Sequence, residues 1–290
     1  MTPTPQPLYD INNANPAYHL RYSWTGWPTG GHFATCPSEL LDTLVEGFQK
    51  DGLRLLEHRW MPELVQLMLS ATPSVSPTIL AQRVKGRLDH ALRQANVMLS
   101  FSRKLAVRTL GENRRVDVER YIRDQVRSER FADPNFERKL KSFTVVNSDV
   151  DLAEPTASAR GRYWYNLHVV LVTDDRHRVT DVDKLTVLRD ACARIAAKKG
   201  YAISTLSLMP DHLHLALRGN IEHSPVQIGR CFQNNLAYVV GNGRLWADGF
   251  YVGSFGEYNM DAVRKIVREN LSHHPDELDG AVGEDRGSND

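Results

Sequence analysis

Two stretches of the chain, HRWMPELVQLML (58–69) and TLSLMPDHLHLAL (205–217), repeat one another at an offset of 148 residues. Both place Met-Pro inside an alternating apolar run, and each has a glycine at the same distance upstream, Gly52 and Gly200. Internal repeats determine an architecture before any local pattern does. The sequence therefore predicts two copies of one structural unit.

The similarity continues in the same order on both sides of these stretches. A Ser-Pro pair follows each one, at Ser76-Pro77 and Ser224-Pro225, and such a pair is typical of a helix N-cap and first helical residue. The further matches are YHLRYSW (18–24) with YNLHVVL (165–171), LAVRTLG (105–111) with FYVGSFG (250–256), and VERYIRDQ (118–125) with VRKIVREN (263–270). This conserved order indicates a tandem duplication.

Each copy has the pattern strand, helix, strand, strand, helix, strand and a final helix. In the second copy we expect these elements at about 163–172, 182–199, 201–208, 210–218, 224–240, 247–254 and 259–271. The order βαββαβ is that of a ferredoxin-like unit. We therefore predict an α+β protein in which two ferredoxin-like domains, each with a C-terminal helix, pack as a pseudo-dimer. The predicted parts are a flexible N-terminal arm (1–16), the first domain (17–127), a linker (128–161), the second domain (162–272) and an acidic disordered tail (273–290).

Composition excludes several classes of protein. Hydrophobic residues make up 41% and charged residues 24%, which is ordinary for a soluble globular chain. There is no apolar run long enough to span a bilayer, the first ten residues lack the pattern of a signal peptide, and the three cysteines have no metal-like spacing. We therefore expect a cytoplasmic protein with no membrane partner and no disulfide framework.

The net charge of +1 conceals a strong asymmetry along the chain. Residues 83–123 contain eleven Lys and Arg against four Asp and Glu, whereas the last twenty residues contain six acidic residues and one Arg. A basic segment of this kind either attracts nucleic acid or forms a solvated helical face.

The strongest local signal for chemistry is Asp211-His212-Leu213-His214. Alternate side chains of a strand share a face, so His212 and His214 project together, roughly 7 Å apart, while Leu213 points to the core. Two neutral imidazoles in this arrangement can bind one divalent metal. The alternative is two half-exposed histidines on an ordinary strand. Asp211 either orients an imidazole from the second coordination shell or caps a turn after the preceding proline.

The MPDHLHL stretch resembles the histidine–hydrophobic–histidine (HUH) motif of IS200/IS605-like single-stranded DNA transposases and their REP-associated relatives. Leu245-Trp246 before the aromatic stretch FYVGSFG also resembles that family. The resemblance covers most of 163–271 and, more weakly, 17–127. It implies a catalytic tyrosine on the terminal helix of each unit, followed four residues later by a polar metal ligand.

The two copies differ from this pattern in complementary ways. The first copy has Tyr121 and Gln125 at the family's Tyr-x-x-x-Gln spacing, but Leu64 and Gln66 replace its histidines. The second copy keeps both histidines, but Ile266 and Asn270 replace the tyrosine and the glutamine. In this family the tyrosine helix of one subunit docks beside the histidines of the other. We therefore predict one composite site, with Tyr121 as nucleophile and His212, His214 and Gln125 as ligands of Mg²⁺ or Mn²⁺.

The predicted function is metal-dependent nicking and strand transfer of single-stranded or hairpin DNA through a 5′-phosphotyrosine. One alternative is a domesticated transposase-derived DNA-binding protein without catalytic activity, and another is a metal-dependent hydrolase unrelated to DNA. A chain that contains both copies needs no second subunit, so we expect a monomer with an internal pseudo-two-fold. Candidate contacts to DNA phosphates are basic side chains of the first copy: Lys85, Arg87, Arg93, Arg103, Arg108, Arg114 and Arg115.

Overall fold

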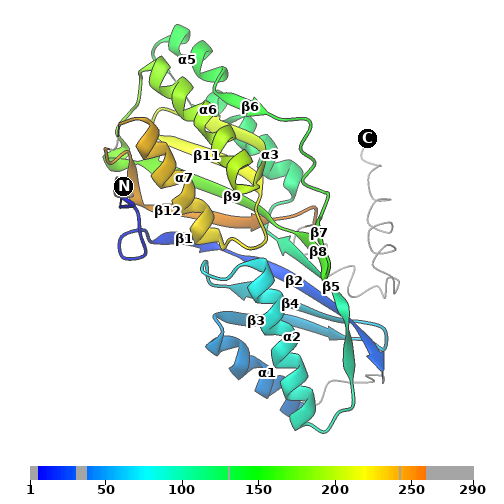
Figure 1. The fold of residues 1–290 in the computed structure, drawn as a ribbon. Coiled ribbons are helices and arrows are strands. Elements are labelled where there is room, and N and C mark those ends of the chain that lie inside the picture. The colour runs from blue at the N-terminus through cyan, green and yellow to red at the C-terminus, as the bar shows by residue number, and fades with distance from the viewer. Residues whose placement is uncertain (1–5, 31–37, 130, 242, 259–290) are drawn as a thin grey trace, which may run out of the picture.

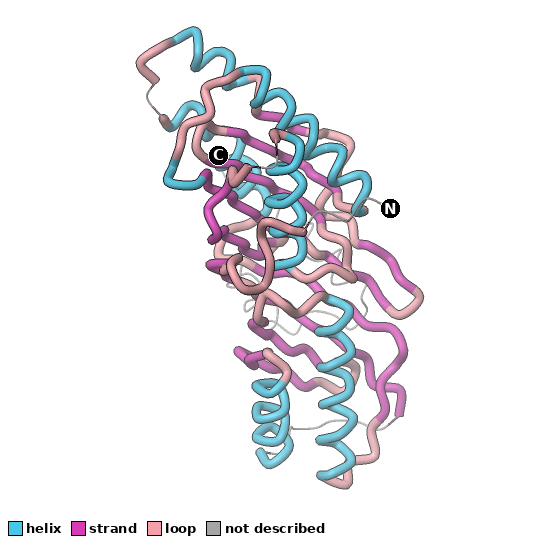
Figure 2. Tube along the Cα trace, turned by 60° about the vertical axis from the view of Figure 1, so that its left-hand side comes forward, coloured by secondary structure: helices cyan, strands magenta, loops and turns pink. Residues whose placement is uncertain are grey.

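The chain is an α+β protein with two six-stranded sheets, one above the other in Figure 1. A computed structural model describes residues 6–30, 38–129, 131–241 and 243–258, and every structural statement below concerns these residues. Figure 2 shows the two halves stacked end to end along the molecule. The expected terminal helix of the second copy (259–271) and the expected acidic tail (273–290) lie outside the described residues.

The lower sheet and its helices come mainly from the first half of the sequence. Its elements are β2 (Arg21–Gly30), α1 (Ser38–Lys50), β3 (Leu53–Trp60), β4 (Val65–Ala71), α2 (Pro77–Gln94) and β5 (Ser100–Leu110). The spatial order of these strands is β3-β4-β2-β5, so the fourth strand in sequence lies beside the first. Helices α1 and α2 contact each other and lie on the same side of the sheet.

The upper sheet repeats this plan with the second half of the sequence. Its elements are β9 (Asn166–Thr173), a short 3₁₀ turn η1 (Asp174–Arg176), α6 (Val182–Lys199), β10 (Ala202–Leu208), β11 (His212–Arg218), α7 (Pro225–Val239) and β12 (Trp246–Phe255). The spatial order is β12-β9-β11-β10, which is again fourth, first, third, second. The expected strand at 163–172 is divided into two strands, of which β9 is the second.

Local signals of the repeat have the expected structural roles. The side chain of Ser76 caps α2 and that of Ser224 caps α7, each with proline in the first turn. Gly52 and Gly200 both have left-handed backbone conformations, with φ of 72° and 70°. A residue with a side chain is strained there, which explains why both copies carry glycine where a helix turns into a strand.

The two halves exchange one short strand each. Strand β1 (Pro16–His19) pairs in parallel with β12 of the upper sheet, and β8 (Gly161–Trp164) pairs in parallel with β5 of the lower sheet. Pro16 lies opposite Phe250, and Gly161 lies opposite Leu105. Positions 16 and 161 differ by 145, as do positions 105 and 250, so the two pairings are equivalent with the halves interchanged. The predicted domain boundaries are therefore corrected: residues 16–19 belong spatially to the second unit, and 161–164 to the first.

Two buried hydroxyl groups link the sheets where these strands cross. The Thr109 hydroxyl donates to the backbone oxygen of Phe255 (2.7 Å), and the Ser254 hydroxyl is 2.6 Å from the backbone oxygen of Leu110. Thr109 and Ser254 are also 145 residues apart, so the same hydrogen bond occurs twice with the halves interchanged. Both residues are buried, so these hydroxyl groups require partners within the protein, and the backbone oxygens of the other half supply them.

The strand pairing corrects one of the repeat alignments. Gln66 lies opposite Thr25 in the lower sheet, and its counterpart His214 lies opposite Val170 in the upper sheet. Thr25 therefore corresponds to Val170, at an offset of 145, whereas the matched stretches at 18–24 and 165–171 imply 147. Both offsets place the same face of the strand inward, so the apolar pattern could not distinguish them.

The predicted linker contains secondary structure. It begins at the last residue of α4 (Gln125–Ser128) and contains α5 (Pro134–Lys141), β6 (Thr144–Val146) and β7 (Thr156–Ser158). Strand β6 extends the upper sheet beside β10, and β7 extends the lower sheet beside β8. This segment therefore adds one edge strand to each sheet, although it has no clear periodicity in sequence.

The predicted flexible arm is anchored to the second half of the chain at Tyr9. Tyr9 is buried in the main hydrophobic core, where its hydroxyl donates to the backbone oxygen of Trp246 (2.8 Å) and accepts from the backbone N–H of the same residue (2.8 Å). The side chain of Asn234 also bonds the backbone of Tyr9 in both directions. The expectation of a flexible arm fails here because one aromatic side chain provides both burial and complete hydrogen bonding.

Candidate active site

Helix α3 (Arg115–Arg123) leaves the lower half and packs on the upper sheet, against β10 and β11. The buried side chains of Val118 and Ile122 form a small cluster with Ala216 and Phe255. Leu213, Leu215 and Leu217 belong instead to the main core, which includes α6 and α7. Because alternate residues of a strand face opposite ways, α3 covers the face of β11 that carries the even-numbered residues, opposite to α6 and α7.

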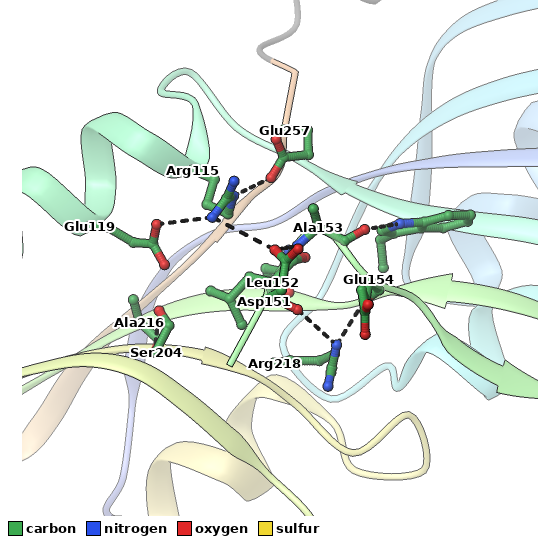
Figure 3. Close-up of polar contacts among 12 residues, drawn as sticks. Arg115, Glu119, Asp151, Leu152, Ala153, Glu154, Ser204, Ala216, Arg218 and Glu257 are labelled. Atoms are coloured by element: carbon green, nitrogen blue, oxygen red, sulfur yellow. Dashed lines mark hydrogen bonds and ion pairs between the residues drawn. The ribbon is translucent and has the colours of Figure 1, made fainter. Parts of the chain in front are cut away.

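Ion pairs fix the first turn of α3 (Figure 3). The guanidinium group of Arg115 contacts the carboxylates of Glu119 on the same helix (3.3 Å), Asp151 (3.9 Å) and Glu257 after β12. Arg115 is a predicted DNA contact, and in the structure its guanidinium group joins α3 to the chain segments around it.

The two histidines of the motif lie side by side on β11. Their ring centroids are 4.9 Å apart and their planes are almost perpendicular, at 89°. His212 places Nδ1 2.7 Å from an Oδ1 of Asp211, whose other oxygen is 3.3 Å from Arg176. Asp211 therefore orients an imidazole, one of the two roles that the sequence allowed. When Nδ1–H of His212 donates to this carboxylate, the lone pair of Nε2 is free to bind a metal.

Burial keeps the second histidine neutral. The pKa of His214 is lowered to about 2, mainly by desolvation and also by the neighbouring His168 and His212. A neutral imidazole has a ring nitrogen lone pair available for a metal without releasing a proton. The donor chemistry at this pair therefore suits a divalent cation.

The structure brings Tyr121 to this pair. Its ring centroid lies 5.5 Å from that of His214, with the planes at 89°, and 6.1 Å from that of His168. The side chain is 54% exposed, so an external substrate can reach the phenol. Tyr121 belongs to the first copy and His214 to the second, 93 positions later in the chain. Docking of α3 accounts for this proximity.

Gln125 is the predicted ligand with the weakest geometric support. Helix α3 ends at Arg123, and Gln125 begins the short α4, so the expected continuous helix is interrupted at Asp124. The side-chain amide of Gln125 is buried and donates to the backbone oxygen of Tyr121 (3.1 Å). Within the described part of the chain, Gln125 makes no hydrogen bond to either imidazole.

A third histidine, His168, lies in the cluster and was missed in the sequence. It is on β9, the neighbour of β11, and its Nε2 lies 3.0 Å from Nδ1 of His214. Burial lowers the pKa of His168 to about 4. The alternation of YNLHVVL places His168 on one face of a strand, but only the pairing of β9 with β11 shows that this is the face of His214.

The equivalent positions in the first copy carry no such cluster. Gln66 corresponds to His214 and Ser23 to His168, and the Gln66 amide donates to the Ser23 hydroxyl (3.1 Å). Leu64, the counterpart of His212, is buried and apolar. The counterparts of Tyr121 and Gln125, Ile266 and Asn270, lie outside the described residues.

A divalent metal fits this donor set in part. The two imidazoles supply nitrogen donors, and a third protein ligand would come from Gln125. Across the described ranges, no three His, Cys, Asp or Glu side chains are arranged to hold a metal ion by themselves. An amide oxygen and substrate oxygens are therefore the ligands that would complete the coordination.

The predicted DNA contacts are dispersed over the lower half. Three of them have local acidic or aromatic partners: Arg87 with Asp51 (2.8 Å), Arg114 with Asp117 (3.4 Å), and Arg108, which stacks over Trp164 at 3.4 Å from the ring centroid. Arg93 donates to the backbone oxygen of Asp89 in its own helix.

The two remaining basic residues share a groove between the halves. Lys85 and Arg103 line an open groove of about 710 Å³ together with Arg160, which the sequence analysis did not select, and Glu222 from the second half. Lys85 also donates to the backbone oxygen of Ser102 (3.1 Å). Two of the seven predicted contacts therefore meet at one surface.

Comparison with known proteins supports the resemblance over the second half of the chain. Residues 162–270 match the model of the family described as "Transposase IS200 like". This region contains the histidine motif but not Tyr121. No curated protein matches the chain.

Two solved structures of transposases show partial similarity. One is described as a putative transposase from Deinococcus radiodurans, with 22% identity and a TM-score of 0.29, covering 38% of this chain and 92% of the other. The second is a REP-associated tyrosine transposase bound to a REP hairpin, with 14% identity and a TM-score of 0.29, covering 36% of this chain and 62% of the other.

In the part of the chain that the structure describes, no helix is long and apolar enough to cross a membrane.

Proposed function

We propose that this protein nicks and rejoins single-stranded or hairpin DNA at one composite site, with Tyr121 as the nucleophile. The observation that carries the proposal is the position of the Tyr121 ring, 5.5 Å from the His214 ring, although the two residues come from different halves. The match of residues 162–270 to the IS200-like transposase family supports a role in DNA transposition chemistry.

In the proposed reaction, the Tyr121 oxygen attacks a backbone phosphorus. The bond from phosphorus to the 3′-oxygen breaks, and the phosphate remains on the tyrosine as a 5′-phosphotyrosine. The phenol loses its proton and the leaving 3′-oxygen gains one, so the step is balanced. A free 3′-hydroxyl can reverse this step and join strands, because the bond energy is kept in the covalent intermediate. The 54% exposure of Tyr121 leaves the phenol open to a DNA strand from solvent.

His212, His214 and the amide oxygen of Gln125 would hold a Mg²⁺ or Mn²⁺ ion in this proposal. Such an ion, when bound, offsets the negative charge of the phosphate and polarises it. Asp211 orients His212 through the 2.7 Å contact to its Nδ1, and the buried amide of Gln125 is held by the backbone oxygen of Tyr121.

We further propose that the chain is a duplicated, single-chain pseudo-dimer of ferredoxin-like units and a monomer in solution. The exchange of β1 and β8 in equivalent registers and the paired hydroxyl contacts of Thr109 and Ser254 support this duplication. Lys85 and Arg103 in the groove between the halves are the basic residues that we propose for phosphate contacts; Arg115 is committed to α3.

The proposal is tested with labelled hairpin and single-stranded DNA and Mn²⁺, followed by denaturing gels that detect label linked to the protein. We expect an adduct with the parent and none with Tyr121→Phe. Tyr238→Phe is a matched control, since Tyr238 is 59% exposed on α7, and it should retain the adduct. An adduct of Tyr121→Phe equal to that of the parent would contradict the proposal.

A mixing experiment tests whether the site forms within one chain. Tyr121→Phe lacks the nucleophile and His214→Ala lacks the imidazole, so an equimolar mixture of the two variants has no complete site if each chain builds its own. We expect no adduct from the mixture. Recovery of adduct would show that chains share sites, and would replace the monomer with a dimer.

The second candidate function is DNA binding without catalysis. The observation that favours it is the Gln125 amide, which bonds its own backbone and not the histidine pair. Hairpin binding by the parent with no adduct under any divalent metal would select this alternative.

A further inference from the structure

We propose that His168 is a positioning residue for His214: its Nε2 accepts the hydrogen of His214 Nδ1–H and so leaves His214 Nε2 free for the divalent metal. This inference rests on the proposed metal site and assigns a role to a residue outside the HUH motif.

The geometry shows a specific contact between the two rings. Nε2 of His168 lies 3.0 Å from Nδ1 of His214, and the rings meet edge to edge, with centroids 5.2 Å apart and planes at 23° to each other. His168 is opposite Ala216 in the pairing of β9 with β11, and His214 is two residues earlier, so the rings meet as diagonal neighbours. The strand register therefore places the two rings side by side, and the nitrogen of His214 that faces His168 is Nδ1.

A hydrogen bond between these two nitrogens has one donor and one acceptor, because each neutral imidazole carries one N–H and one lone pair. A proton on Nδ1 of His214 leaves the lone pair of His214 on Nε2, where a metal can bind. A proton on Nε2 of His168 would instead force the proton of His214 onto Nε2 and block it. Metal-binding histidines generally donate their second N–H to an acceptor in the surrounding shell, and His168 is the acceptor that the fold supplies.

Two other contacts agree with this direction. His212 places the same atom, Nδ1, against the carboxylate of Asp211, which can only accept. Both His212 and His214 then have the lone pair of Nε2 free to bind a metal. In the first copy, Gln66 at the position of His214 donates to Ser23 at the position of His168, so the same polarity of the cross-strand bond occurs in both copies.

The tautomer of His214 can be measured in the metal-free protein. We expect nitrogen–proton correlation spectra of ¹⁵N-labelled parent protein to show His214 with its hydrogen on Nδ1. His168→Gln keeps an acceptor at the end of a side chain of similar length, and should keep this tautomer. His168→Phe keeps a ring but no acceptor, and should lose the preference. A hydrogen on Nε2 of His214 in the parent overturns the inference.

Metal affinity is the second readout, measured by calorimetric titration with Mn²⁺ alone. We expect His168→Phe to bind about tenfold more weakly than the parent, and His168→Gln to bind within about twofold of it, because loss of such an orienting partner typically costs 10- to 100-fold. Equal affinity of the parent and His168→Phe would overturn the role of His168. So would X-ray absorption spectra that show a third imidazole on the bound Mn²⁺, since His168 would then be a ligand.

The two readouts separate this inference from the proposed function. If the parent binds no Mn²⁺, the metal-dependent mechanism fails, and the tautomer spectra still decide whether His168 orients His214. Thermal unfolding of each variant confirms that the comparison concerns folded protein.

Discussion

Attachment of α3 to the upper sheet is the structural condition for the proposed site, and Ile122→Ala tests it. Ile122 is 0% exposed and packs with Val118, Ala216 and Phe255, while the adjacent Tyr121 lies at the imidazoles. The substitution removes three buried carbon atoms. At about 0.8 kcal/mol for each carbon, plus the cavity that remains, we expect the free energy of unfolding to fall by about 2–4 kcal/mol.

The assay is urea denaturation followed by circular dichroism, combined with the yield of protein–DNA adduct. Val116→Ala is the matched control on the same helix, because Val116 is 48% exposed, and we expect it to change the free energy of unfolding by about 0.5 kcal/mol or less. Ile122→Ala should also lower the adduct yield at temperatures where the fold persists, since Tyr121 loses its fixed position. Equal stability of the two variants would refute the docking of α3 on this sheet.

Three further predictions concern the junction and the charges of the lower half. Thr109→Val and Ser254→Ala should each lower the free energy of unfolding by about 1–3 kcal/mol in chemical denaturation, and by similar amounts, because each removes the equivalent buried hydrogen bond at the junction. Arg115→Met should lower it by about 1–2 kcal/mol in calorimetry, with the loss shrinking in high salt, because the acidic partners of Arg115 lose their cation. Arg87→Gln tests a pH dependence: the Arg87 hydrogen bond lowers the pKa of Asp51, so the pair stabilises the fold above the unfolded pKa of about 3.9 and is lost as pH falls through the folded value. The free energy of unfolding of the parent should therefore exceed that of Arg87→Gln by about 1 kcal/mol or less near neutral pH. The two free energies should become equal at the acid end of a pH titration.

Much of the fold could be predicted because its signals are local. The Ser-Pro helix starts, the glycines Gly52 and Gly200, and the alternation around Met-Pro each act over a few residues, and they recur in both copies. Within the described residues, each half has the expected order strand, helix, strand, strand, helix, strand, and α3 is the terminal helix expected for the first copy. The sequence predicted the arm and the linker less well, because burial of Tyr9 and pairing of β6 and β7 depend on surfaces that distant residues provide.

The candidate site likewise has a part that the sequence predicted and a part that it could not predict. That His212 and His214 share a face is a property of any strand, so two residues of spacing were sufficient to predict it. The resemblance to a family, and not any local pattern, selected Tyr121. His168 could not be selected, because its contact with His214 depends on the register between β9 and β11, and registers that differ by two residues have the same apolar pattern.

The sequence alone indicated a repeat, one order of strands and helices for both copies, and an imidazole pair that one copy has and the other lacks. Only the tertiary structure decided that the copies exchange β1 and β8, that α3 crosses to the far unit, and that Tyr121 and His168 meet the imidazoles there. The physical reason is the separation along the chain over which each interaction acts. Backbone periodicity and capping act between neighbours in the chain, whereas strand exchange and helix docking depend on the burial of surfaces about a hundred residues apart, which no local pattern records.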